Sequence, residues 1–162
     1  MKIRKFNGFD EHGYLPYGMY NMSVYEFEDI FCTFSKKREE IRFEHKKHLK
    51  EIQNTGYFID HWIGGSYISD KKYPHDIDTL SEFDGIEVNK NRDNEIIDEL
   101  INNSKLHTNG LCHSLKVYRY PPSDEIKYDY YLKSKIRILT TLFDTDKNGI
   151  AKGVIHLIGV KQ

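Results

Sequence analysis

The chain contains little cysteine and no long apolar run. Among its 162 residues there are two cysteines, Cys32 and Cys112, which are too few for a disulfide framework, and we predict that both are buried free thiols. Nowhere do 18 consecutive apolar residues occur, so the pattern of a transmembrane helix is absent. The basic start, residues 1–5, is not followed by the apolar stretch of a signal peptide. We therefore expect a soluble, cytoplasmic protein without a membrane partner.

The chain also has almost no net charge. Its 24 Lys and Arg residues are balanced by 25 Asp and Glu residues, for a formal net charge of -1, so there is no overall basic field to attract a nucleic-acid backbone. Any contact with nucleic acid would have to be local. Aromatic residues are abundant instead, with 12 Tyr and 9 Phe, and they predict a largely aromatic core. A chain of this length is expected to form one domain, residues 1–162.

Gly64, Gly65 and Ser66 form the first part of the most informative motif. They follow residues 57–63, whose aromatic and β-branched side chains predict a strand, so the glycines fall where that strand turns. Glycines at such a turn let backbone N–H groups approach a phosphate. The hydroxyl of Ser66 can donate one more hydrogen bond, and the start of a short following helix favours an anion. The sequence therefore predicts a phosphate-binding turn.

Asp76 and Asp78 form the second part of the motif, in a second extended run after a nine-residue gap. Residues two apart in a strand point to the same side, so both carboxylates are predicted to face the turn. Two carboxylates this close repel each other unless a cation lies between them. Their oxygen atoms suit Mg²⁺, or Mn²⁺, brought in with nucleotide phosphates. Either half alone is often only a solvated turn, and it is their combination that indicates nucleotide chemistry.

At these residues the chain resembles the nucleotidyltransferase superfamily, which has the DNA polymerase β-like fold and the signature Gly-Ser, a gap, then Asp-x-Asp. More narrowly, it is similar to a group of small bacterial and phage proteins with that fold, which share stretches like residues 13–18 and 152–155. The resemblance implies an α+β fold with a mixed β-sheet flanked by helices. It also implies that Gly65 and Ser66 hold nucleotide phosphates and that Asp76 and Asp78 hold the metal.

The same resemblance implies a third metal-binding carboxylate on a later strand, which is predicted at residues 111–120. Residues 112–118 contain no Asp or Glu. From alternation, Lys116 shares one face of this strand with Ser114 and Tyr118; if that face lines the cleft, its ammonium replaces part of the missing cation charge and contacts the nucleotide. His113, on the opposite face, could act as a base. A displaced acid could come from Glu82, Asp84, Asp124 or Asp129.

The remaining pattern alternates helices and strands. Ser23 and Glu26 form a capping box that opens a long N-terminal helical segment, either one helix or two abutting ones, ending at Gly56. The elements expected after the first strand are a short helix at 67–70, an extended run at 76–88, a helix at 93–104 with Ile96, Ile97, Leu100 and Ile101 inward, a strand at 111–120, a helix at 128–143 and a strand at 150–160. This order predicts a sheet with helices packed on it.

The leading hypothesis is a metal-dependent nucleotidyltransferase that transfers a nucleoside monophosphate from an NTP to a protein, an RNA or a small molecule. The alternative is a catalytically weakened module of the same fold that holds a nucleotide or a protein partner, for example in phage defence or a toxin–antitoxin system. The missing acid favours this second reading, and the intact motif favours the first. A protein partner or a homo-oligomer fits either. A metal-dependent hydrolase such as a nuclease is a weaker third reading, because the glycine turn would then have no role.

Overall fold

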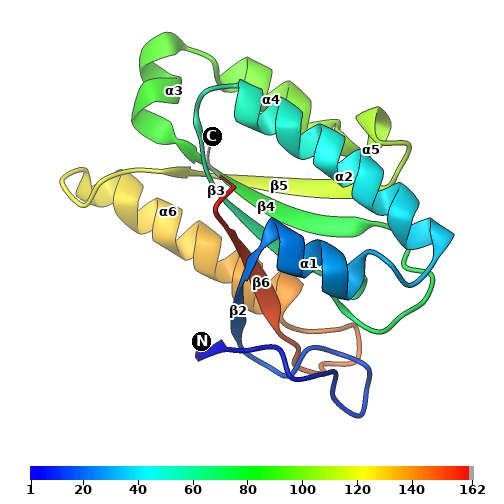
Figure 1. Ribbon diagram of the computed structural model, residues 1–162. Helices are drawn as coiled ribbons and strands as arrows, with labels where there is room; N and C mark the ends of the chain where they lie inside the picture. The colour runs from blue at the N-terminus through cyan, green and yellow to red at the C-terminus, as the bar shows by residue number, and fades with distance from the viewer. Residues whose placement is uncertain (161–162) are drawn as a thin grey trace.

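The computed structural model describes residues 1–160 and shows a mixed α+β fold built on one six-stranded sheet (Figure 1). The order of the strands in the sheet is β1-β2-β6-β3-β4-β5. Their bounds are Ile3–Arg4 for β1, Met19–Ser23 for β2, Phe58–Gly64 for β3, Ile77–Asp84 for β4, Cys112–Arg119 for β5 and Val154–Ile158 for β6. The predicted α+β class with a mixed sheet is confirmed, and residues 161–162 of the predicted domain lie outside the described residues.

The central strands run in both directions. β3 is antiparallel to β4 and to β6, whereas β4 and β5 are parallel, as are β2 and β6. Gly64, at the end of β3, pairs with Asp78 near the start of β4, and Asp78 pairs in turn with His113 of β5. The sheet therefore brings the glycine turn and the aspartate motif to the same end of neighbouring strands.

Helices cover both faces of the sheet (Figure 1). The helices are α1 (Val24–Phe31), α2 (Lys36–Asn54), α3 (Gly85–Asn91), α4 (Asn94–Asn102), α5 (Ser104–His107) and α6 (Glu125–Arg137), with a 3₁₀ turn η1 (Ser66–Ile68) and a π-helical turn η2 (Ile138–Phe143). Side chains of β4 alternate between the two layers. Ile77 and Phe83 pack in the clusters built with α1 to α4, and Leu80 packs with α6 and η2 on the other face.

The long N-terminal helical segment consists of two helices, one of the two arrangements expected. The capping box is confirmed, because the Ser23 side chain accepts from the backbone N–H of Glu26 and the Glu26 carboxylate accepts from that of Ser23. The chain breaks between Phe31 and Lys36, where the Ser35 side chain caps α2 by accepting from the N–H of Arg38. Phe34 lies in this break and is 41% exposed.

Several predicted boundaries are wrong for identifiable reasons. β4 ends at Asp84 rather than continuing to residue 88, because the Asp84 side chain accepts from the N–H groups of Ile86 and Glu87 and so begins α3. Ile96 is 60% exposed rather than inward, whereas Ile97 and Ile101 are buried as expected. Strand β2 was not expected, and β6 spans only part of residues 150–160.

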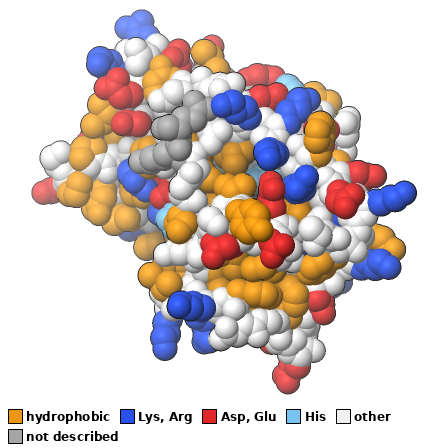
Figure 2. Space-filling model, in the orientation of Figure 1, with side chains coloured by type: hydrophobic (Ala, Val, Ile, Leu, Met, Phe, Trp, Pro, Cys, Tyr) orange, Lys and Arg blue, Asp and Glu red, His pale blue; other side chains and the backbone are white. Residues whose placement is uncertain are grey.

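Both cysteines are buried free thiols, as predicted. Over residues 1–160, no helix combines the length and the apolar character needed to cross a bilayer. On the face drawn in Figure 2, acidic and basic side chains are interspersed and no large area carries one sign of charge. This agrees with the balanced composition and gives no broad basic surface on that face.

Candidate nucleotide and metal site

Two glycines allow the turn after β3 to be packed on both sides. A Cβ added to Gly64 would lie 2.3 Å from the ring of Phe143, and one added to Gly65 would lie 1.9 Å from Oδ2 of Asp78. Gly65 also has φ +74° and ψ −163°, a conformation that other residues rarely adopt. The carboxylate of Asp78 therefore lies directly against the backbone of Gly65, which joins the two halves of the sequence motif.

Ser66 follows at the first position of η1 and is partly exposed. Its carbonyl accepts a 2.6 Å hydrogen bond from the Ser69 hydroxyl. Within residues 1–160 its own hydroxyl has no hydrogen-bond partner among the side chains and backbone. The hydroxyl is therefore available to a ligand at the turn, as the sequence predicts.

A buried arginine fixes the segment that follows the turn. Arg38 of α2 is 0% exposed, and its guanidinium donates to the carbonyls of Phe31, Tyr67, Ser69 and Lys71 at 2.6–3.0 Å. One side chain thus satisfies the end of α1 and the backbone of η1 together. The buried hydroxyl of Tyr67 donates back to the Arg38 carbonyl at 2.9 Å. These bonds hold the start of η1 rigidly against the two N-terminal helices.

Asp78 and Asp76 have different neighbours. Oδ1 of Asp78 lies 3.0 Å from Nδ1 of His113 on the adjacent strand. Asp76 precedes β4, and its Oδ2 lies 3.5 Å from Nζ of Lys105 in α5. Asp78 thus faces the turn as predicted, whereas the ion pair of Asp76 is directed at α5. Both carboxylates are partly exposed, with side-chain exposures of 28% for Asp78 and 22% for Asp76.

Lys116 does not face the two aspartates, so the condition under which it would contact the nucleotide is not met. Its Nζ lies 3.0 Å from Asp98 and 3.2 Å from Asn102, both in α4. Ser114 and Tyr118 share this face, which packs against helices, and their hydroxyls pair with His48 and Asp98. Alternation grouped these residues correctly, but only tertiary packing decides which face of β5 meets the helices. The face that meets Asp78 carries His113.

None of the four displaced acids considered contacts Asp78 in the described part of the chain. Glu82 is 0% exposed and is held by Arg119 at 2.8 Å and Lys135 at 2.5 Å, with hydrogen bonds from Trp62 and Tyr131. Burial raises the pKa of Glu82, but the bonds and charges of Lys135 and Arg119 outweigh it and the net pKa is lowered. The other three have local roles: Asp84 caps α3, Asp124 caps α6 and Asp129 pairs with Lys133. The third carboxylate is therefore not restored from these positions.

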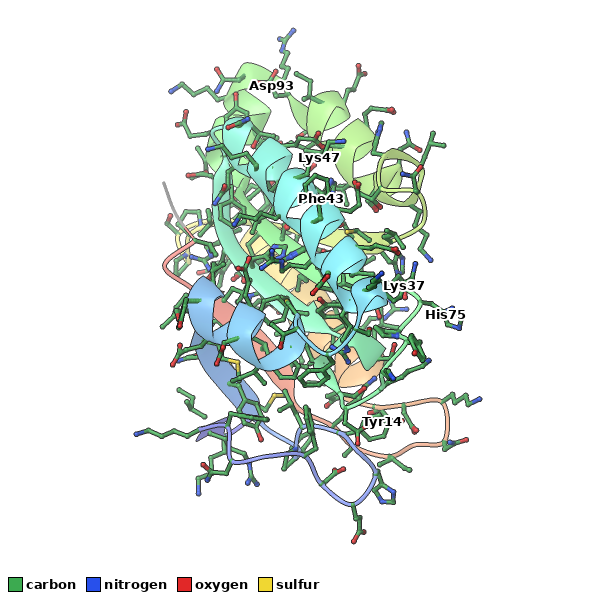
Figure 3. The ribbon with its side chains drawn as sticks, turned by 45° about the vertical axis from the view of Figure 1, so that its right-hand side comes forward. Tyr14, Lys37, Phe43, Lys47, His75 and Asp93 are labelled. Atoms are coloured by element: carbon green, nitrogen blue, oxygen red, sulfur yellow. The ribbon has the colours of Figure 1, made fainter. Side chains whose placement is uncertain are left out.

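Segments from the two ends of the chain complete the surroundings of the turn. Tyr14 bridges to Ser69 beside η1, and its hydroxyl donates to Oδ2 of Asp146 at 3.1 Å. Figure 3 shows Tyr14 beside the loop that leads into β6. From this loop comes Lys152, whose backbone N–H donates to the Asp144 carbonyl and whose side chain is 8% exposed. In the sequence, only the two short stretches at residues 13–18 and 152–155 drew attention to these segments.

The donors suit one divalent ion that arrives with a nucleotide better than a preformed metal cage. Among residues 1–160 no group of three or more His, Cys, Asp or Glu side chains is arranged to hold a metal ion. Mg²⁺ is commonly held by one or two carboxylates together with substrate phosphates and water. Asp78 fits that pattern as a single carboxylate ligand, and Asp76 would have to leave its pair with Lys105 to join it. A second ion would need a further carboxylate, and His113 stands beside Asp78 instead.

Apolar grooves lie elsewhere on the molecule. One of about 540 Å³ runs between β5 and α6, lined by Val117, Tyr118, Ile126 and Tyr130 among others. Another of about 520 Å³ lies along α2 beside Phe43. Of the predicted site residues only Lys116 borders either groove, so neither is the predicted nucleotide site.

A family model described as "Family of unknown function (DUF6932)" matches residues 7–158. Because the match covers most of the chain, the chain belongs to this family. No curated protein and no solved structure matches it. The chemistry of the residues around the turn is therefore what indicates a function.

Proposed function

We propose that this member of the DUF6932 family is a nucleotidyltransferase-like protein that binds an NTP with Mg²⁺ or Mn²⁺ and transfers the nucleoside monophosphate to an acceptor. The observation that carries the proposal is the contact of the Asp78 carboxylate with the backbone of Gly65. It puts an oxygen ligand for a metal beside a glycine turn suited to phosphate. Metal and phosphate would then be held at one point, as a metal–nucleotide complex requires.

The architecture supports the same proposal. The six-stranded mixed sheet with helices on both faces agrees with the fold that the resemblance to the DNA polymerase β-like superfamily implies. The turn follows β3 and the aspartates open β4, so the order and spacing of the motif agree with that signature. Arg38 keeps the intervening η1 in place through its four carbonyl contacts. A fixed turn lowers the ordering cost of binding a flexible triphosphate.

In the proposed reaction an acceptor hydroxyl oxygen attacks the α-phosphorus of the NTP. A new phosphorus–oxygen bond forms, the bond from the α-phosphorus to the bridging oxygen breaks, and pyrophosphate leaves with that electron pair. The hydroxyl proton passes to solvent. The metal ion offsets the negative charge of the phosphates when it is bound. In this scheme Gly65 and Ser66 position the phosphates, and Asp78 with Asp76 holds the ion.

A second function is favoured by one observation: His113 lies beside Asp78 on the strand where the resemblance implies a third carboxylate. Imidazole is a poorer ligand for Mg²⁺ than a carboxylate, so a second ion that activates the attacking hydroxyl would be weakly held. The protein would then bind a metal–nucleotide without transferring it efficiently. Such a module could present the nucleotide, or the same surface, to a protein partner.

The two functions are separated by following a labelled nucleotide. Purified protein is incubated with each of the four α-labelled NTPs and Mg²⁺ or Mn²⁺, with and without cell lysate, beside Asp76→Asn/Asp78→Asn as the matched control. Label transferred by the wild type alone supports a transferase, and the labelled material identifies the acceptor as protein, RNA or small molecule. Metal-dependent binding without transfer supports the binding module. Absence of both binding and transfer contradicts both functions.

A further inference from the structure

Lys152 is a buried lysine whose ammonium has no hydrogen-bond or ion-pair partner in the described part of the chain. Its side chain is 8% exposed. Within residues 1–160, Nζ makes no hydrogen bond and no ion pair within 4.0 Å, although 16 such pairs occur elsewhere in the described chain. Nζ is not among the fully enclosed unsatisfied atoms, which comprise only His48 Nδ1. The stem of Lys152 is therefore buried, while its ammonium reaches an opening on the surface.

The opening lies at the proposed nucleotide site. Lys152 Nζ is 5.8 Å from the ring centroid of Tyr14, which bridges to Ser69 beside η1. Asp78, Asp146 and Asp144 all lie close enough to act electrostatically on Lys152: burial lowers its pKa, and the three carboxylates oppose that effect. Asp78 is the residue that touches Gly65. Lys152 thus lies beside Tyr14, which links it to the segment that follows the glycine turn.

The backbone around Lys152 is fixed rather than loose. The N–H of Gly153 donates to the Leu15 carbonyl at 2.8 Å, and that of Lys152 donates to the Asp144 carbonyl at 2.6 Å. A Cβ added to Gly153 would lie 2.6 Å from the ring of Tyr20. The backbone that carries Lys152 is therefore held in place, while its ammonium has no ion-pair partner within residues 1–160. Burying a charged group without a partner is costly, which favours a site that is completed by an anion.

We infer that Lys152 contacts the phosphates of the nucleotide, binding the triphosphate tail of the metal–NTP complex held by Gly65 and Asp78. The inference rests on the proposed function. It assigns to Lys152 the positive charge that the sequence analysis expected from Lys116. Three carboxylates act electrostatically on this one ammonium, so a triphosphate without a metal ion is expected to be repelled. A divalent ion bound with the phosphates offsets the carboxylates. The contact with Lys152 consequently forms with the metal complex and not with the metal-free nucleotide.

The test compares Lys152→Met with Lys116→Met, which removes a lysine that pairs with α4 on the opposite face. Calorimetry measures the binding of Mg²⁺–NTP, Mg²⁺–tripolyphosphate and the Mg²⁺-free nucleotide, and circular dichroism checks the fold of each variant. Loss of one charge-assisted contact is expected to weaken Mg²⁺–NTP binding to Lys152→Met by about 10- to 100-fold. Lys116→Met should bind as the wild type does.

A measurement on the wild type keeps the test decisive if Lys152→Met does not fold. The side-chain NMR resonances of Lys152 should shift when Mg²⁺–NTP or Mg²⁺–tripolyphosphate is added, and not when the nucleoside is added with Mg²⁺. If the wild type binds Mg²⁺–NTP but Lys152→Met binds equally well, or the resonances do not move, the role of Lys152 is refuted and the proposed function stands. If the wild type binds no Mg²⁺–NTP, the proposed function fails, and the inference fails with it.

Discussion

Gly65 and Asp78 depend on one another, because the space that a side chain at residue 65 would fill is occupied by the Asp78 carboxylate. Their proximity follows from the pairing of Gly64 with Asp78 across β3 and β4. The sequence motif predicted that these residues meet, because the aspartates were expected to point from their strand toward the glycine turn. At this single contact the backbone conformation favours glycine at residue 65, and the proposed ligand would need the carboxylate of Asp78.

Gly65→Ala is expected to destabilise the protein and to abolish metal-dependent nucleotide binding. The substitution adds backbone strain of about 1–3 kcal/mol and also displaces Asp78. The matched control is Gly110→Ala, which has φ +80° but nothing within 4 Å of an added Cβ. Urea denaturation should show a larger loss of unfolding free energy for Gly65→Ala. Equal losses, with nucleotide binding intact, would show that the contact with Asp78 is unimportant.

Asp76→Asn/Asp78→Asn is expected to keep its fold and lose the rise in melting temperature that NTP and Mg²⁺ give the wild type. Both carboxylates are partly exposed, and asparagine at residue 78 can still hydrogen-bond His113. Asp98→Asn, which loses the ion pair with Lys116 on the other face but can still accept from the Tyr118 hydroxyl, serves as the control. The melting temperatures of the wild type and both variants are measured by thermal unfolding, with and without metal and NTP. A double variant that no longer folds would instead assign the aspartates a structural role.

The residues that sequence reasoning misplaced or missed depend on packing between distant segments. Alternation assigns Lys116 and His113 to opposite faces of β5, but it does not say which face meets the helices. Lys152 looks like any charged residue before a strand until its burial beside Tyr14 is known. The motif residues could be predicted because their information is local in the chain.

At the scale of elements, the join between α1 and α2 controls the position of the turn. Arg38→Met is expected to lower the unfolding free energy by about 3 kcal/mol or more, because it leaves several carbonyls of α1 and η1 without a donor at about 1–3 kcal/mol each. Arg42→Met, on the same helix, removes only a partly exposed pair with Glu28 and should cost less than about 1 kcal/mol. Chemical denaturation of the two variants tests the contrast, and similar losses would contradict it.

Two buried histidines between α2 and the sheet make the stability depend on pH. Nε2 of His45 lies 3.0 Å from Nε2 of His61, whose Nδ1 lies 2.9 Å from the Ser81 hydroxyl. Burial lowers the pKa of His45 to about 3 and also lowers that of His61. Below about pH 6.5 the unfolded chain binds protons that the native state does not bind, so the stability contribution is present above that pH and is lost as the pH falls toward the folded pKa values.

Below pH 6, these two histidines are expected to lower the unfolding free energy by up to about 2.7 kcal/mol for each pH unit of acidification. Each histidine contributes about 1.36 kcal/mol. Denaturation of the wild type at pH 7.5 and 5.0 is compared with His45→Gln, in which the slope should be reduced. His75→Gln is the control, since His75 is exposed and projects from the molecule in Figure 3. An unchanged slope in His45→Gln would show that the pair is not the source of the pH dependence.

The elements with local signals were predictable. The capping box at Ser23 and the aromatic strand before Gly64 carry their own signals in the sequence. The end of β4 and the whole of β2 do not, because Asp84 acts as a cap only once α3 forms and Met19–Ser23 becomes a strand by pairing with β6. Strand pairing between distant segments overrides weak local preference.

At the scale of the whole molecule, the sheet brings two segments that are distant in the sequence, around Tyr14 and Lys152, toward the glycine turn. Tyr14 and Lys152, far apart in the sequence, lie together beside η1 because β2 pairs with β6 and β6 pairs with β3. The α+β class could be predicted from the order of the elements. The meeting of Tyr14 and Lys152 could not, because local sequence patterns do not determine the order of strands in a sheet. The proposed site is thus a product of topology as much as of motif.

The central claim is that the turn at Gly65 and the carboxylate of Asp78 bind a metal–nucleotide together. Isothermal titration calorimetry of the wild type with each of the four NTPs, in the presence and absence of millimolar Mg²⁺ or Mn²⁺, tests it most directly. We predict binding of at least one NTP that requires the metal and is lost in Asp76→Asn/Asp78→Asn. No heat with any NTP at millimolar metal, or binding that is the same without metal, would contradict the claim.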